Sequence, residues 1–110
     1  MSKNPTPERS TDLVVDEIIS TFKASRFAQV PGYKRFEFVK ESRGAVTVLR
    51  ENGNTADVRK AVLAKAVEAV REKQRIYTKG PSSLRDFGIT HVTSPTWALL
   101  RLLPLNDLVR

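Results

Sequence analysis

The chain has 110 residues, of which 40% are hydrophobic and 28% charged, a composition that excludes an intrinsically disordered chain and suits one hydrophobic core. Because it has no cysteine, disulfides, thiolate nucleophiles and thiolate metal sites are excluded. Nineteen Lys and Arg against twelve Asp and Glu give a formal net charge of +7, which favours a polyanionic partner.

The first residues, MSKNPTPERSTD, are polar and carry two prolines. They lack the apolar segment of a signal peptide, and no later run approaches the roughly 18 apolar residues of a membrane span. We expect a flexible arm over residues 1–10, a single globular domain over residues 11–110, and a location in the cytoplasm.

Helical spacing of apolar residues predicts a first helix from Thr11 to Phe27, which Pro31 and Gly32 close. The stretch YKRFEFVKESRGAVTVLREN (residues 33–52) alternates and breaks at residues 42–44, which predicts a β-hairpin with Phe36 and Phe38 on one face. Asn52-Gly53 favours a tight turn into a third strand over residues 54–58. A third strand is one of two possibilities for this segment, because Thr55 could equally cap a helix.

A second amphipathic helix is predicted from about Asp57 to Tyr77 and is ended by Gly80-Pro81. A short turn over residues 84–87 follows. Ser94 with Pro95 then opens a last helix that runs to Leu103. The predicted fold class is therefore α+β: a small antiparallel sheet of a hairpin or three strands packed on two longer helices and a short C-terminal helix, in the order α-β-β-(β)-α-α.

The last predicted helix carries one apolar stripe formed by Trp97, Leu100 and Leu103. We expect this stripe to close the core, because the first two helices leave the sheet without a complete cover. The same stripe is the candidate surface for a homodimer, an alternative kept open by the leucines beyond Pro104.

No set of residues points to catalysis. The single histidine, His91, cannot form a two-histidine metal site and is interpreted as a partly buried structural residue. Glu37 and Glu41 share a strand without a third carboxylate, and each glycine stands alone instead of forming a phosphate-binding motif. We expect no enzyme activity, no metal and no cofactor.

The basic residues concentrate on two predicted elements. A projecting hairpin with Arg43 at its tip could enter a groove while the other cations contact phosphates, although edge-strand cations also serve to prevent aggregation. On the second helix, Lys60, Arg71 and Arg75 fall in one row that only Glu68 interrupts. The predicted nucleic-acid-binding residues are Lys34, Arg35, Lys40, Arg43 and Arg50 on the hairpin, Lys60, Arg71 and Arg75 on the helix, and Lys79 and Arg85 after it.

The aromatic residues fit the core better than a binding surface. The five phenylalanines, Phe22, Phe27, Phe36, Phe38 and Phe87, follow apolar periodicities and are predicted to be buried. Tyr33 and Tyr77 lie next to cations, where packing is expected and stacking on an unpaired base is the alternative.

The order of helix, strands and the helix with ADVRKAVLAKAVEAV resembles the double-stranded-RNA-binding domain, whose second helix begins with a Lys-rich cluster against phosphates. Here that position holds only Arg59-Lys60, and a C-terminal helix is added. VTVLRENGNT and SPTWALLRLLP are similar to accessory modules of DNA-modifying or restriction-type proteins.

Together these features predict a non-enzymatic basic nucleic-acid-binding module that contacts phosphates through the hairpin and one helix face. DNA is slightly favoured over RNA, because the strands carry no ladder of aromatic side chains. The alternative is a protein–protein interaction module, an inhibitor or assembly partner, that docks an acidic protein surface and could form a homodimer.

Overall fold

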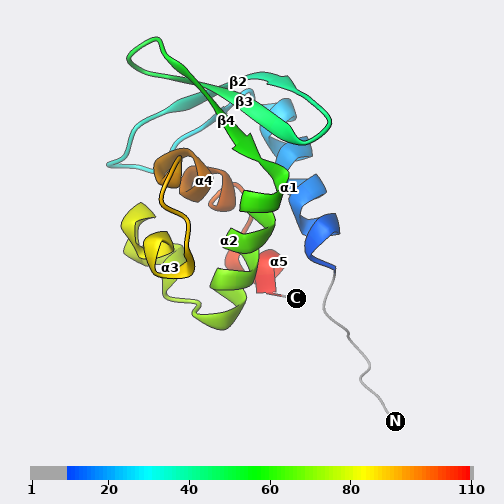
Figure 1. Cartoon of the computed structure of the whole chain (residues 1–110), viewed down its shortest axis with the longest axis vertical. Helices are drawn as coiled ribbons and strands as arrows, with labels where there is room; N and C mark the ends of the chain where they lie inside the picture. The colour runs from blue at the N-terminus through cyan, green and yellow to red at the C-terminus, as the bar shows by residue number, and fades with distance from the viewer. Residues whose placement is uncertain (1–9, 110) are drawn as a thin grey trace.

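A four-stranded antiparallel sheet forms one layer of the protein, and the helices pack against one side of it (Figure 1). The computed structural model describes residues 10–109, and within them the predicted α+β class is confirmed. In chain order the elements are α1 (Thr11–Ser25), β1 (Phe27–Ala28), β2 (Phe36–Glu41), β3 (Ala45–Arg50), β4 (Thr55–Arg59), α2 (Lys60–Glu72), α3 (Ile76–Lys79), the 3-10 helix η1 (Pro81–Phe87), α4 (Thr93–Leu100) and α5 (Leu105–Val109).

The N-terminal arm predicted for residues 1–10 lies outside the described residues except for Ser10. The Ser10 side-chain oxygen accepts the Leu13 N–H at 3.2 Å and so provides the N-cap of α1.

The sheet contains the predicted hairpin and the third strand. Phe38 pairs with Val48 across the hairpin, and Val46 pairs with Val58 of β4. The turn at Gly53, where φ is 89°, connects β3 to β4 as the Asn-Gly signal predicts. The open question about residues 54–58 is thereby settled in favour of a strand.

The first helix is shorter than predicted, and its last predicted residue, Phe27, begins a fourth strand. Arg26 adopts a left-handed conformation with φ 71° and ends α1, its N–H bonded to the Phe22 carbonyl at 2.8 Å. The Arg26 carbonyl then accepts the Phe38 N–H at 2.8 Å, which draws Phe27 and Ala28 alongside β2 as β1. The predicted burial of Phe27 is wrong: 40% of the residue is exposed.

The predicted second helix, residues 57–77, is divided among three elements. Its first residues belong to β4, because pairing with β3 continues up to the Lys60 N–H, which bonds the Gly44 carbonyl at 2.9 Å. At the other end Lys73 is extended, with φ −136°, and the chain turns into α3. That turn places Ile76 in the core and removes Arg75 from the helix.

The C-terminal segment also differs from the prediction. The predicted turn over residues 84–87 is part of a longer 3-10 helix that begins at Pro81. α4 begins at Thr93, after Val92 at φ 50°, and ends at Leu100 instead of Leu103. α5 was not predicted. None of the helices described between residues 10 and 109 combines the length and the apolar character of a membrane span.

Trp97 lies in the core, as predicted, with 1% of its surface exposed. Its Nε1–H donates to the Ile76 carbonyl at 2.9 Å, so the buried indole has its polar group satisfied. Leu100 and Leu103 are buried as well, at 0% and 4% exposure. All three side chains are buried inside the molecule, so they form no exposed stripe. The homodimer surface predicted for them therefore has no support.

Candidate nucleic-acid interface

The cations predicted on the hairpin lie at its two opposite ends. Lys40 and Arg43 are exposed near the β2–β3 turn. Lys34 and Arg35 are not on a strand but in the loop before β2, and the half-buried Arg50 ends β3 beside them. Because each strand has six residues, the two ends are separated by about 20 Å. The hairpin therefore does not present these cations as one patch.

Two cations of the row predicted on the second helix have partners inside the molecule. The Lys60 ammonium lies 2.9 Å from one Glu41 carboxylate oxygen, and Lys23 of α1 lies 3.2 Å from the other. The Arg71 Nε–H donates to the Leu108 carbonyl at 2.7 Å. We assign Lys60 and Arg71 to holding elements of the fold together.

The two lysines also act on the charge of Glu41. Hydrogen bonds, first from Lys60 and then from Lys23, lower the pKa of the Glu41 carboxyl, and the slight burial of the group opposes this only in part. Glu41 is thus ionised at neutral pH and connects α1, β2 and α2.

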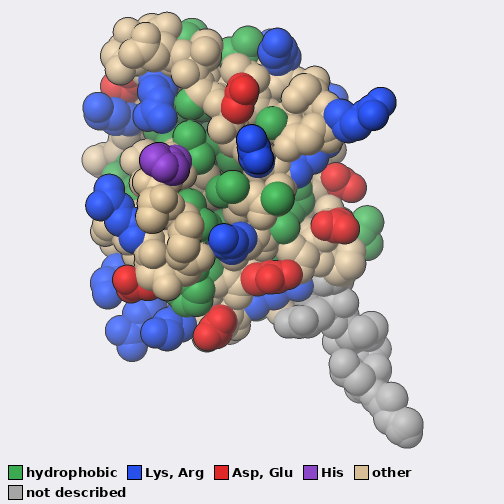
Figure 2. All heavy atoms as spheres, in the orientation of Figure 1, with side chains coloured by type: hydrophobic (Ala, Val, Ile, Leu, Met, Phe, Trp, Pro, Cys, Tyr) green, Lys and Arg blue, Asp and Glu red, His purple; other side chains and the backbone are tan. Residues whose placement is uncertain are grey.

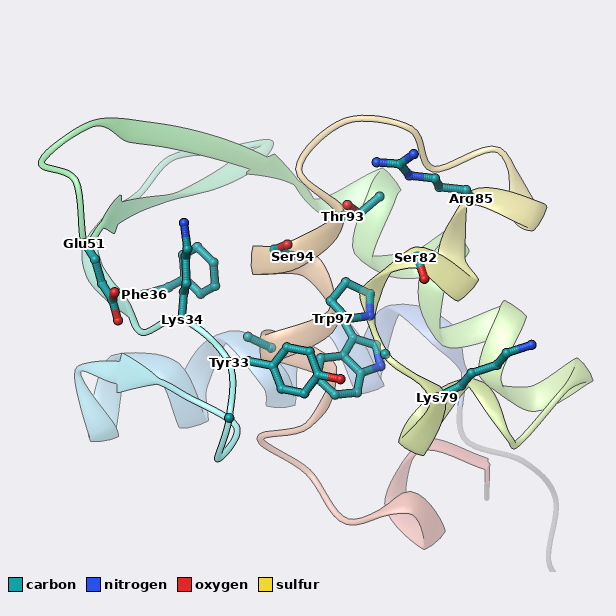
Figure 3. A pocket seen from close by; sticks show the side chains of 14 residues that line it. Tyr33, Lys34, Phe36, Glu51, Lys79, Ser82, Arg85, Thr93, Ser94 and Trp97 are labelled. Carbon is teal, nitrogen blue, oxygen red and sulfur yellow. The ribbon is translucent and has the colours of Figure 1, made fainter.

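A cleft of about 570 Å³ brings together three segments that are far apart in the sequence (Figure 3). Its lining comes from the loop before β2, from the segment around α3 and η1, and from the first turns of α4. Three predicted cations, Lys34, Lys79 and Arg85, belong to this lining. Within residues 10–109 none of the three forms an ion pair or a side-chain hydrogen bond.

The three cations differ in their direction (Figure 3). Lys34 rises along one wall beside Glu51, whose carboxylate already accepts the Arg35 backbone N–H at 2.8 Å. The Arg85 side chain extends above Thr93 on the opposite side, whereas the Lys79 ammonium points away from the centre. Lys34 and Arg85 are therefore the cations that flank the cleft.

Short hydroxyl side chains lie between these cations. Ser82, Thr93 and Ser94 line the cleft, the last two from the first turn of α4. The lining of the cleft thus combines three hydroxyl groups with its two flanking cations.

An aromatic pair forms the floor of the cleft. The Tyr33 ring packs on the Trp97 indole with 4.8 Å between centroids and 58° between planes. Tyr33 is 43% exposed, while Trp97 lies beneath it (Figure 3). The structure thus confirms packing for Tyr33 and also leaves part of the ring accessible. Tyr77 is occupied differently, because its hydroxyl donates to the Leu103 carbonyl at 2.7 Å.

Further cations continue from the cleft along one side of the molecule. Lys79 also lines a second hollow of about 130 Å³, together with the cations Lys73 and Arg75 and one acid, Asp86. Figure 2 shows Lys and Arg side chains gathered on the side that carries α3 and η1. We call this set the basic edge: it consists of Lys34, Lys73, Arg75, Lys79 and Arg85.

His91 is exposed, which corrects the prediction of a partly buried residue. It lines a separate hollow with Arg59 and Lys65. Among residues 10–109 no three His, Asp or Glu side chains come close enough to hold a metal ion together. The carboxylate of Glu37 lies 3.9 Å from Arg35.

Comparison with protein-family models, with curated proteins and with solved structures gave no match. Between α1 and α2 the chain follows the order of helix, strands and helix of the double-stranded-RNA-binding domain, but with β1 added before β2. At the start of α2, however, Lys60 is paired with Glu41, so the cluster that this family uses is not reproduced. Any assignment of function therefore rests on the geometry of the basic edge and its cleft.

Proposed function

We propose that this protein is a non-enzymatic nucleic-acid-binding module of the cytoplasm, and that the nucleic acid lies along the basic edge. The cleft is the observation that supports this most. Lys34 and Arg85 flank its hydroxyl side chains, and neither cation forms an ion pair with a carboxylate among residues 10–109. Lys, Arg and Ser or Thr side chains are the groups that proteins use to contact phosphate oxygens. DNA remains the favoured polyanion.

The outer face of the sheet offers no comparable concentration of positive charge. Thr47 there donates to the Asp57 carboxylate at 2.6 Å, and the register places the cations Lys40 and Arg59 on the same face as the acids Asp57 and Glu37. Mixed charges of this kind are typical of a solvated sheet face. We therefore propose the basic edge as the interface, in place of the hairpin and the helix face that the sequence pattern predicts.

Fluorescence anisotropy with labelled duplex DNA, duplex RNA and single strands at about 50 mM salt tests the proposal. We expect binding that weakens with salt, because each phosphate contact to a duplex contributes about −0.9 to the slope of log K against log salt concentration. The double variant Lys34→Glu/Arg85→Glu should lose at least 10-fold in affinity. Absence of binding to all three probes would exclude nucleic-acid binding.

The matched control is Lys40→Glu/Arg43→Glu, which makes the same change in net charge at the far end of the hairpin, on two exposed residues. We expect this control to lose much less affinity. An equal loss in both double variants would show that net charge alone, and not the basic edge, determines binding.

The alternative function, docking to an acidic protein surface, is favoured by one observation. Tyr33 is exposed among cations, and Tyr and Arg are enriched in the centres of protein interfaces. Under this alternative the purified protein would bring down a defined protein partner, whereas nucleic-acid binding predicts a contaminant that absorbs at about 260 nm and is removed by high salt.

A further inference from the structure

We propose that the cleft receives one unstacked nucleotide of a single strand, with its base against Tyr33 and its phosphate between Lys34 and Arg85. The inference rests on the proposed function and specifies the form of nucleic acid and the mode of binding.

The lining of the cleft has two chemically different parts. Its floor is apolar and aromatic, formed by Tyr33 and Trp97 with Pro81 and Ala98. Its rim carries the cations and the hydroxyl side chains, together with the carboxylate of Glu51, which accepts the Arg35 backbone N–H. A matching ligand must combine a flat apolar ring with a phosphate group, and a nucleotide does so, because base–aromatic stacking tolerates every base.

A base that remains in its stack cannot reach the floor of the cleft. A volume of about 570 Å³ lies in the range of about 300–1,000 Å³ that is usual for small-ligand pockets. In a duplex the faces of the bases are covered by their neighbours, so a duplex can contact the rim through its phosphates but cannot reach Tyr33. Contact with the floor requires a base that has left the stack.

The Tyr33 ring is already held in place for such a contact. It packs on Trp97, and the indole is fixed by the 2.9 Å hydrogen bond from its Nε1–H to the Ile76 carbonyl. The Tyr33 hydroxyl lies against Gly80, where an added Cβ would approach it to 3.2 Å. A base would therefore stack on Tyr33 with little loss of side-chain entropy.

The surroundings of the cleft favour a strand over a free nucleotide. Lys79 belongs to the lining of both hollows, and Lys73 and Arg75 extend the positive charge beyond the cleft. A free nucleotide would leave these cations unused, whereas the phosphates that follow in a strand can lie along them.

The test compares a labelled oligothymidine strand with a duplex of the same length, using the wild type, Tyr33→Leu and Tyr33→Phe. Leucine keeps an apolar cover over Trp97 but cannot stack, so Tyr33→Leu should weaken single-strand binding about 10-fold and change duplex binding less than about 2-fold. Tyr33→Phe keeps the ring and should bind the strand as the wild type does. Unchanged single-strand affinity of Tyr33→Leu would overturn the nucleotide in the cleft.

A second measurement uses only the wild type and does not depend on the folding of a variant. Trp97 is the single tryptophan and lies directly under Tyr33, so its emission should change when oligothymidine binds and stay constant when the duplex binds. A bound strand that leaves the emission unchanged would overturn the proposal.

Thymidine monophosphate tests whether the cleft receives a nucleotide of a strand or a free nucleotide. We expect it to bind at least 10-fold more weakly than the strand. Equal affinities would overturn the strand and indicate a site for free nucleotides. If Lys34→Glu/Arg85→Glu loses strand binding but Tyr33→Leu does not, nucleic-acid binding stands and only the nucleotide in the cleft is refuted. A wild type that binds neither the strand nor the duplex refutes the proposed function itself.

Discussion

Replacing Trp97 with alanine tests whether this side chain holds the helices and the cleft floor together. Because 1% of the residue is exposed, the change removes a fully buried ring and should lower the free energy of unfolding by about 3–5 kcal/mol. Part of this cost is the Ile76 carbonyl, which loses its donor at 2.9 Å. Against a total of about 5–15 kcal/mol for a typical domain, the variant should be barely stable.

Trp97→Phe separates the contribution of the buried ring from that of the hydrogen bond to the Ile76 carbonyl. Phenylalanine keeps much of the ring volume but has no N–H, so the loss should be about 1–3 kcal/mol and should mainly report the unpaired Ile76 carbonyl. Urea unfolding followed by circular dichroism measures both variants without using the missing fluorophore, provided that the m-values agree with the wild type. A Trp97→Ala variant within about 1 kcal/mol of the wild type would refute the core assignment.

Three further changes test individual contacts. Glu41→Gln should destabilise the fold by less than about 1 kcal/mol near neutral pH. Because folding lowers the Glu41 pKa, the wild type is more stable than the variant at pH values above the Glu41 pKa of the unfolded chain. In thermal melts this difference in stability should vanish as the pH falls through the Glu41 pKa of the folded protein. Arg71→Ala should lower the free energy of unfolding by about 1.5–3 kcal/mol, because it removes the hydrogen bond to the Leu108 carbonyl. Arg75→Ala should leave this free energy nearly unchanged, because Arg75 is exposed, although the sequence pattern placed both residues in one row of a helix. Gly80→Ala should destabilise by about 1–3 kcal/mol because φ is 118°, and in the same variant single-strand binding should weaken, since the new methyl group displaces Tyr33.

The pattern of apolar residues was sufficient to predict the fold class and most of the core. Val14, Ile18 and Phe22 of α1 are buried as their spacing indicates, and the hairpin turns where Gly44 and Gly53 predict. These elements are specified locally, by periodicity and turn residues.

The errors occur where tertiary contacts override local preference. No glycine or proline marks the end of α1 at Ser25, which depends on the pairing of Phe27 with β2. Lys73 likewise ends α2 within a sequence of good helix formers, because the chain turns to bury Ile76. A two-residue strand such as β1 is too short to show any alternation.

The candidate site was predicted only in part, because convergence in space leaves no mark in a single sequence. Lys34, Lys79 and Arg85 were identified as cations, but their assembly into one cleft required the fold. Ser82 and Ser94 were not predicted as binding residues, and Ser94 was predicted only to open the last helix. Their place in polar loops rich in Gly, Pro and hydroxyl residues was the available signal, and it is shared by many ordinary turns.

The cleft is assembled from residues 32–36, 79–85 and 93–98 together with Glu51, so no short piece of the chain contains it. A ligand that occupies it must therefore bind the native state and not the unfolded chain, and its binding energy is added to the stability of the fold. At a ligand concentration 100 times the Kd this linkage amounts to about 2.7 kcal/mol. A rise in melting temperature on titration with oligothymidine, absent with an uncharged polymer, would reveal the ligand without any label, and the size of the rise would give its affinity.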